Sequence, residues 1–278
     1  MKEKDSRRII ILLCGVVCCL IMGFAYTYSL IQPYVMKYFN IESSSASLPY
    51  TILLAVFVVG NYVGGVMQKK VKVKIVMFIG YLLMAVGAFT TSLLPQTAPA
   101  GMWLTYGGLL GLGDGMVYNV IIAMMQKWFP DKKGLATGIT LAILGVSATI
   151  LSPLCNKWLV AYGLAGTFKI LTGIFVAIAI FGMLTIKAPP EGYMSDYRPT
   201  GASAVSSRQC STAGECFKTK EYYMLTVIYF CAIPAFVLLS SIFVSYGTSK
   251  GLSSALAVTG VSVASLMQVA GRFLVSTA

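Results

Sequence analysis

Apolar residues fall into eight long runs along the chain, separated by polar segments. The runs cover residues 9–31, 48–67, 75–94, 102–126, 134–156, 164–186, 222–246 and 252–278. A helix rises about 1.5 Å per residue, so each run is long enough to cross a hydrocarbon core about 30 Å thick. The pattern therefore predicts an all-α integral membrane protein with roughly eight transmembrane spans.

The polar segments between the runs differ in length. Pro33, Pro95 and the charged stretch 130–133 mark short connections, whereas 187–221 is a long polar segment and the one expected linker between domains. The first run follows basic residues, as in a signal peptide, but it is too long for one and no Ala-x-Ala cleavage site follows it. We interpret it as a retained span.

Composition agrees with insertion into a membrane. Hydrophobic residues make up 57% of the chain and charged residues 11%, and the mean hydropathy is +0.80. Soluble domains are about 25% charged. A water-soluble fold could not bury so much apolar surface, so a soluble protein is excluded.

The basic residues mark alternate connections between the runs. Apart from Lys37, Lys157 and Lys250, the Lys and Arg residues outside the spans lie in the N-terminal tail and after the second, fourth and sixth runs. Because cytoplasmic loops are enriched in Lys and Arg, this predicts a multi-pass protein of the cell (plasma) membrane with a cytoplasmic N-terminus. The basic loops account for the net charge of +12. The sequence has no stripe of basic residues interleaved with aromatic residues, so it does not indicate a nucleic-acid partner.

Few side chains suit catalysis or metal binding. The chain has no histidine, and its seven cysteines form no Cys-x-x-Cys pair, so catalytic triads and His-based metal sites are excluded. Asp114 is the one carboxylate within the spans, which leaves no acid/base pair. Neither a phosphate-binding P-loop nor a channel filter motif occurs. We expect no enzyme, no metal and no cofactor.

Two charges lie inside the runs, where ionised groups are costly and usually face a cavity or a partner. Asp114 is near the middle of the fourth run, and Arg272 lies well inside the eighth. Asp114 either couples proton movement or acts as a counter-ion, or else it is a structural pair or a neutral buried acid. Arg272 either binds a carboxylate in a bidentate manner through its planar guanidinium group or extends toward the cytoplasmic interface.

Glycines are frequent inside the spans, at spacings that let helix backbones approach closely. They include Gly60 and Gly64 in the second run, Gly134 and Gly138 in the fifth, and five in the fourth. Generic packing explains any single one, whereas the density in the fourth run indicates a helix that bends or slides.

Several segments resemble one transporter family. Gly-Met-Val-Tyr-Asn at 115–119 and Gln-Lys-Trp-Phe-Pro-Asp-Lys-Lys-Gly-Leu-Ala-Thr-Gly at 126–138 are similar to the signature of the oxalate/formate antiporter family, within the major facilitator superfamily. The segments 23–29, 188–193 and 270–272 are similar too. The resemblance extends along the whole chain.

The resemblance implies two six-span bundles that rock around a central carboxylate site. The chain would then comprise an N-terminal bundle (1–186), a cytoplasmic linker (187–221) and the first two spans of an incomplete C-terminal bundle (222–278). It also implies that Arg272 binds the carboxylate and that Tyr26 and Tyr118 form part of an aromatic cage. Tyrosines that pack or lie at the membrane interface are the alternative.

Three departures from the family pattern change the expectation. The gating loop after the second run keeps Gly64, Lys69 and Lys72 but has Gln68 in place of an aspartate and Val71 in place of a glycine, which predicts a weaker gate. Leu144 replaces a tyrosine of the oxalate carrier, and Asp114 replaces an apolar residue. A monocarboxylate moving with a proton therefore fits better than oxalate.

The third departure is length, since the sequence ends in or just after an eighth span. The leading hypothesis is a secondary active transporter of small carboxylates, such as formate, oxalate, pyruvate or lactate, working by antiport or proton symport. The alternative is a non-transporting fragment, or one part of a split transporter whose partner chain supplies spans nine to twelve.

Overall fold

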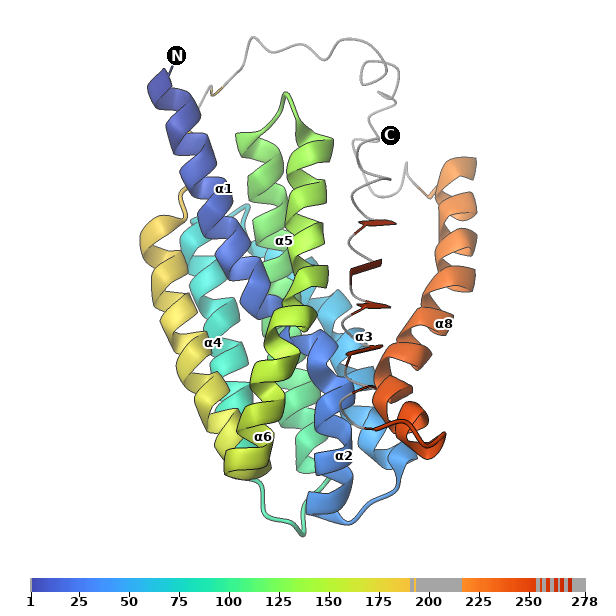
Figure 1. Cartoon of the computed structure of the whole chain (residues 1–278). Coiled ribbons are helices and arrows are strands. Elements are labelled where there is room, and N and C mark those ends of the chain that lie inside the picture. Colours follow the sequence, from blue (N-terminus) through green and yellow to red (C-terminus); the bar gives the residue numbers. More distant parts are fainter. Residues whose placement is uncertain are drawn as a thin grey trace.

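The protein is a bundle of long helices (Figure 1). The computed structural model describes residues 2–190, 193 and 217–253, together with 256, 259–260, 263–264, 266–267 and 270–271. The helical elements there are α1 (Lys2–Met22), η1 (Gly23–Thr27), α2 (Tyr28–Phe39), α3 (Ser43–Met67), α4 (Val73–Ser92), η2 (Trp103–Leu110), α5 (Gly111–Trp128), α6 (Lys133–Thr185) and α8 (Lys220–Ser249). The predicted all-α fold is confirmed.

Five helical stretches among the described residues are long and apolar enough to cross a membrane. One of them, α6, contains two spans, because its backbone breaks at Gly163, which has φ +65°. The break lies between the predicted runs 134–156 and 164–186. The first helical stretch continues from α1 through η1 to Phe39, past the end of its apolar run, because a helix need not end where the hydrocarbon does.

Packing within the bundle pairs helices that are not consecutive in the sequence. α3 packs along η2 and α5, α4 packs along α5 and α6, and α1 packs against α6. Val58, Val59 and Tyr62 of α3 are exposed. Exposed apolar side chains are expected on the lipid-facing surface of such a bundle.

Glycines allow α3 and α5 to touch backbone to backbone. A Cβ added to Gly64 of α3 would lie 2.8 Å from the carbonyl oxygen of Met116 and 2.9 Å from its Cα. A Cβ added to Gly115 of α5 would lie 2.8 Å from the backbone nitrogen of Asn61. Each helix therefore presents glycine where the backbone of the other passes, as close helix contacts in membranes require.

The last described helix, α8, touches the rest of the bundle at one end. It contacts α2 and, to a lesser extent, α3. In Figure 1 it approaches α2 near its own C-terminal end and diverges toward its N-terminal end.

We predict that Gly64→Ala destabilises the bundle by about 1–3 kcal/mol, because the added methyl group meets backbone atoms that cannot move aside. Thermal unfolding in detergent can be followed with a thiol-reactive dye, since Cys18, Cys19 and Cys155 are buried and become reactive on unfolding. Gly65→Ala is the matched control, because its Cβ would lie 3.5 Å from the side chain of Asn119, an ordinary contact. Equal melting temperatures for the two variants would contradict the prediction.

Candidate functional site

A cavity of about 80 Å³ lies in the middle of the bundle, between the first helical stretch, α3, α5 and α6. Three of the residues singled out in the sequence lie together on its wall: Tyr26, Asp114 and Tyr118. The remaining lining residues are mostly apolar or aromatic, namely Met22, Ala25, Tyr50, Leu53, Leu54, Phe57 and Leu144. Residues more than 90 positions apart in the sequence therefore meet at one small site.

One irregular helical segment lines part of this cavity, and a second directly precedes the helix that carries Asp114. Tyr26 lies in η1, a 3₁₀ segment that interrupts the first span between α1 and α2. Asp114 lies in the first turn of α5, directly after the π-helical segment η2. Short 3₁₀ and π segments inside long helices often mark hinges and functional sites. The first departure from regular helix thus contributes Tyr26 to the cavity wall, and the second ends one turn before Asp114.

Gly23 lets the first span approach α6 beside the cavity. A Cβ at this position would lie 2.9 Å from the carbonyl oxygen of Leu144. Leu144 is itself a lining residue. The close approach therefore places Leu144 on the cavity wall beside the first span.

Asp114 is almost completely buried, with 4% of its surface exposed. Its Oδ1 atom accepts no hydrogen bond from the described part of the chain. No basic residue is among the described residues that line the cavity. A buried carboxyl group without a cation or donor is costly when ionised. An ion pair with another described residue therefore does not explain why an aspartate occupies this position.

Aromatic rings form much of the cavity wall. The rings of Phe57 and Tyr118 lie 5.3 Å apart, inclined at 60°. Tyr50 stacks on Tyr28 with ring centroids 5.3 Å apart and an interplanar angle of 11°. The sequence did not single out Tyr50 or Phe57, because an aromatic residue in an apolar run carries no signal that separates a cavity wall from helix packing.

The loop after α3 is tied directly to α5. Gln68 donates a hydrogen bond from its Nε2 to the Oδ1 of Asn119, at 2.8 Å. Asn119 follows the cavity residue Tyr118 in the sequence. Lys69 and Lys72 of the same loop are exposed. Gln68 therefore makes a neutral contact between the loop after α3 and the helix that carries Asp114 and Tyr118.

This hydrogen bond should appear as an energetic coupling between Gln68 and Asn119. In a double-mutant cycle with Gln68→Ala and Asn119→Ala, we expect a coupling free energy of about 0.5–1 kcal/mol, typical of hydrogen bonds between membrane helices. Unfolding free energies in mixed micelles give the measurement. As a control, Asn61 bonds Phe57 of its own helix, so Gln68→Ala and Asn61→Ala should be additive. A coupling of zero for the first pair would show that the contact contributes nothing.

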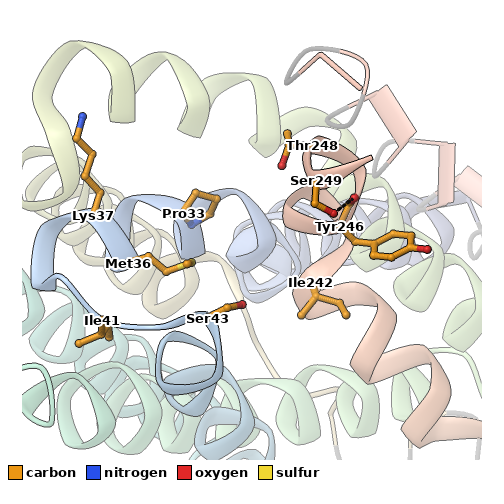
Figure 2. Close-up of a pocket in the computed structure, with 9 residues that line it drawn as sticks. All are labelled: Pro33, Met36, Lys37, Ile41, Ser43, Ile242, Tyr246, Thr248 and Ser249. Atoms are coloured by element: carbon orange, nitrogen blue, oxygen red, sulfur yellow. Dashed lines mark hydrogen bonds between the residues drawn. The ribbon is translucent and has the colours of Figure 1, made fainter. Parts of the chain in front are cut away.

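Arg272, the predicted carboxylate ligand, lies outside the described residues. A second cavity, of about 730 Å³, lies between α2 and α8. Figure 2 shows Pro33, Met36 and Lys37 from α2 on one side, and Tyr246, Thr248 and Ser249 from α8 on the other. It contains none of the site residues predicted from the sequence, and so the smaller cavity is the candidate functional site.

Comparisons with known proteins agree with this arrangement of helices. The family model that matches, over residues 13–277, is that of the Major Facilitator Superfamily. A crystal structure of a D-xylose-proton symporter aligns with a TM-score of 0.62 at 11% identity, over 94% of this chain and 66% of that chain. At that identity, the likeness shows the fold alone.

Curated relatives are transporters of greater length. The chain is 25% identical to the uncharacterized MFS-type transporter YhjX of Escherichia coli (strain K12) over 91% of its own length and 61% of the relative's. It is 26% identical to the oxalate:formate antiporter of Oxalobacter formigenes, over 89% and 57%. For monocarboxylate transporter 2 of Meriones unguiculatus, the identity is 29%, over 69% and 39%. The chain thus spans less than two thirds of each of these proteins.

Proposed function

Because the chain belongs to the major facilitator superfamily, we propose that it works as a secondary active transporter of small carboxylates by alternating access. It is a multi-pass membrane protein with a transporter fold and not an enzyme. The proteins it is similar to include an oxalate:formate antiporter and monocarboxylate transporters. These names support small carboxylates as the substrate class.

The observation that carries the proposal is the meeting of Tyr26, Asp114 and Tyr118 on the wall of one small, partly open cavity. A cavity of about 80 Å³ has room for a ligand of few heavy atoms. The two tyrosine hydroxyl groups can donate hydrogen bonds to a carboxylate, and the aromatic faces can enclose its apolar part. A small monocarboxylate meets these conditions.

Charge balance supports proton symport for this substrate. An ionised Asp114 would repel a carboxylate strongly in a buried site, because Coulomb energies rise as the dielectric constant falls. A protonated Asp114 can instead donate a hydrogen bond to the substrate. The anion would then bind together with a proton, and the loss of either would promote release of the other.

Arg272 completes the proposed site. Its guanidinium group would supply the positive charge that the described lining residues lack, and its fork matches a carboxylate in a bidentate manner. Leu144 on the cavity wall supports a substrate with one carboxylate rather than two, because an apolar side chain cannot hydrogen-bond to a second carboxylate group.

The proposal also includes the placement of the chain. The N-terminus is cytoplasmic, the membrane is the plasma membrane, and the linker 187–221 separates the N-terminal bundle, 1–186, from the start of a second bundle, 222–278. An assembly with a partner chain that supplies further spans is the alternative.

The direct test of function is uptake of radiolabelled formate, pyruvate, lactate and oxalate into proteoliposomes. A gradient of one pH unit, acidic outside, supplies about 1.4 kcal/mol, enough for about tenfold accumulation of a substrate that moves with one proton. We expect saturable uptake of a monocarboxylate that this gradient accelerates. Correctly inserted protein without uptake of any of the four compounds would favour the non-transporting fragment.

Asp114→Asn separates proton coupling from substrate binding. The amide keeps the shape and a hydrogen-bond donor but cannot carry a proton across. We expect the variant to exchange labelled for unlabelled substrate while its net uptake no longer responds to the pH gradient. Asn61→Asp, by contrast, leaves Asp114 in place and should retain the response. If Asp114→Asn kept the pH profile of the wild type, Asp114 would not be the coupling residue.

A further inference from the structure

A crevice of about 530 Å³ lies where α1, the end of α5 and the segment after α6 meet. Its lining combines apolar side chains with one ammonium group: Ile10, Ile11, Trp128, Leu184, Thr185, Lys187, Ala188 and Pro190. It is separate from the candidate transport site, with which it shares no residue. Neither the family match nor the proposed transport cycle gives it a role.

The frame of the crevice is held by a compact set of contacts. The Nε of Arg8 donates a hydrogen bond to the carbonyl oxygen of Trp128 at 3.1 Å, and its guanidinium group pairs with Asp131 and lies 4.6 Å from the centre of the Phe129 ring. The indole N–H of Trp128 donates a hydrogen bond to the carbonyl oxygen of Lys187 at 2.8 Å. Three distant segments are thereby fixed around one opening.

The crevice opens on the lipid-facing side of the bundle. Ile10 is 57% exposed and Leu184 is 71% exposed, and Leu13 and Ile180, further into the same spans, are exposed as well. Apolar side chains with this exposure on membrane helices face acyl chains. Lys187 is exposed just beyond the end of α6, at the level where Lys side chains meet lipid headgroups. Trp128 is buried beside it at the end of α5.

From this arrangement, we propose that the crevice binds an anionic phospholipid. The lipid belongs to the membrane leaflet on the same side as the N-terminus of the chain. The ammonium group of Lys187 pairs with the lipid phosphate, and Ile10 and Leu184 contact an acyl chain. Arg8 is paired with Asp131, so Lys187 supplies the charge in the lining. The apolar walls favour a lipid over free phosphate, which has no acyl chain to place there. Basic crevices between membrane helices are suited to such headgroups.

Brominated lipids can test the site, because bromine on an acyl chain quenches tryptophan fluorescence at short range. Trp103→Phe and Trp158→Phe leave Trp128 as the one tryptophan of the 278-residue chain. In nanodiscs, brominated phosphatidylglycerol should quench Trp128 more than an equal fraction of brominated phosphatidylcholine does. An ammonium group at a membrane surface is worth about 1 kcal/mol, and we expect a preference of about fivefold.

Lys187→Gln should reduce this preference to near one, whereas Lys169→Gln, at an exposed position of α6 outside the crevice, should keep it. An unchanged emission maximum of Trp128 would show that each variant is folded. Equal quenching by the two lipids in the Lys187 protein would overturn the proposal, as would an unchanged preference in Lys187→Gln. Loss of the preference on adding millimolar glycerol phosphate would show a free-phosphate site and would also overturn it.

Discussion

Reciprocal glycine contacts between α3 and α5 are the constraint on which the rest of the bundle depends. Gly60 and Gly64 of α3 lie against the backbone of α5, and Gly111 and Gly115 of α5 lie against the backbone of α3. Because a bilayer provides no hydrophobic drive between helices, close backbone packing must supply the association. The spacing of these two helices then determines how far apart their intervening side chains lie.

The cavity is a consequence of this spacing. Leu53 and Phe57 precede the contact glycines along α3, and Asp114 and Tyr118 alternate with the contact glycines along α5. All four line the cavity. The same helix pair continues to the Gln68–Asn119 hydrogen bond at the end of α3. The loop after α3 is therefore connected by a neutral hydrogen bond to the helix that carries Asp114.

Sequence reasoning predicted the helical architecture, and it singled out three residues that the structure places around one cavity. Asp114 was identifiable because a carboxylate in the middle of an apolar run is rare, and Tyr26 and Tyr118 because they occupy family positions. Tyr50 and Tyr62 have no such mark. Tyr50 is 3% exposed and lines the cavity, whereas Tyr62 is 74% exposed, although both lie within α3. The side of a helix that faces a cavity depends on its neighbours, which no local pattern encodes. For the same reason, the hydrogen bond between Gln68 and Asn119 could not be predicted from the sequence.

The central claim is that the carboxylate binds in the cavity beside Asp114, and filling that cavity tests it most directly. Equilibrium binding of a radiolabelled monocarboxylate can be measured for Leu144→Trp, which places a large ring on the cavity wall. The control Leu154→Trp puts the same ring at an exposed position of α6. The account predicts saturable binding by the wild type and the control, and its loss in Leu144→Trp. Undiminished binding by a folded Leu144→Trp protein would contradict it.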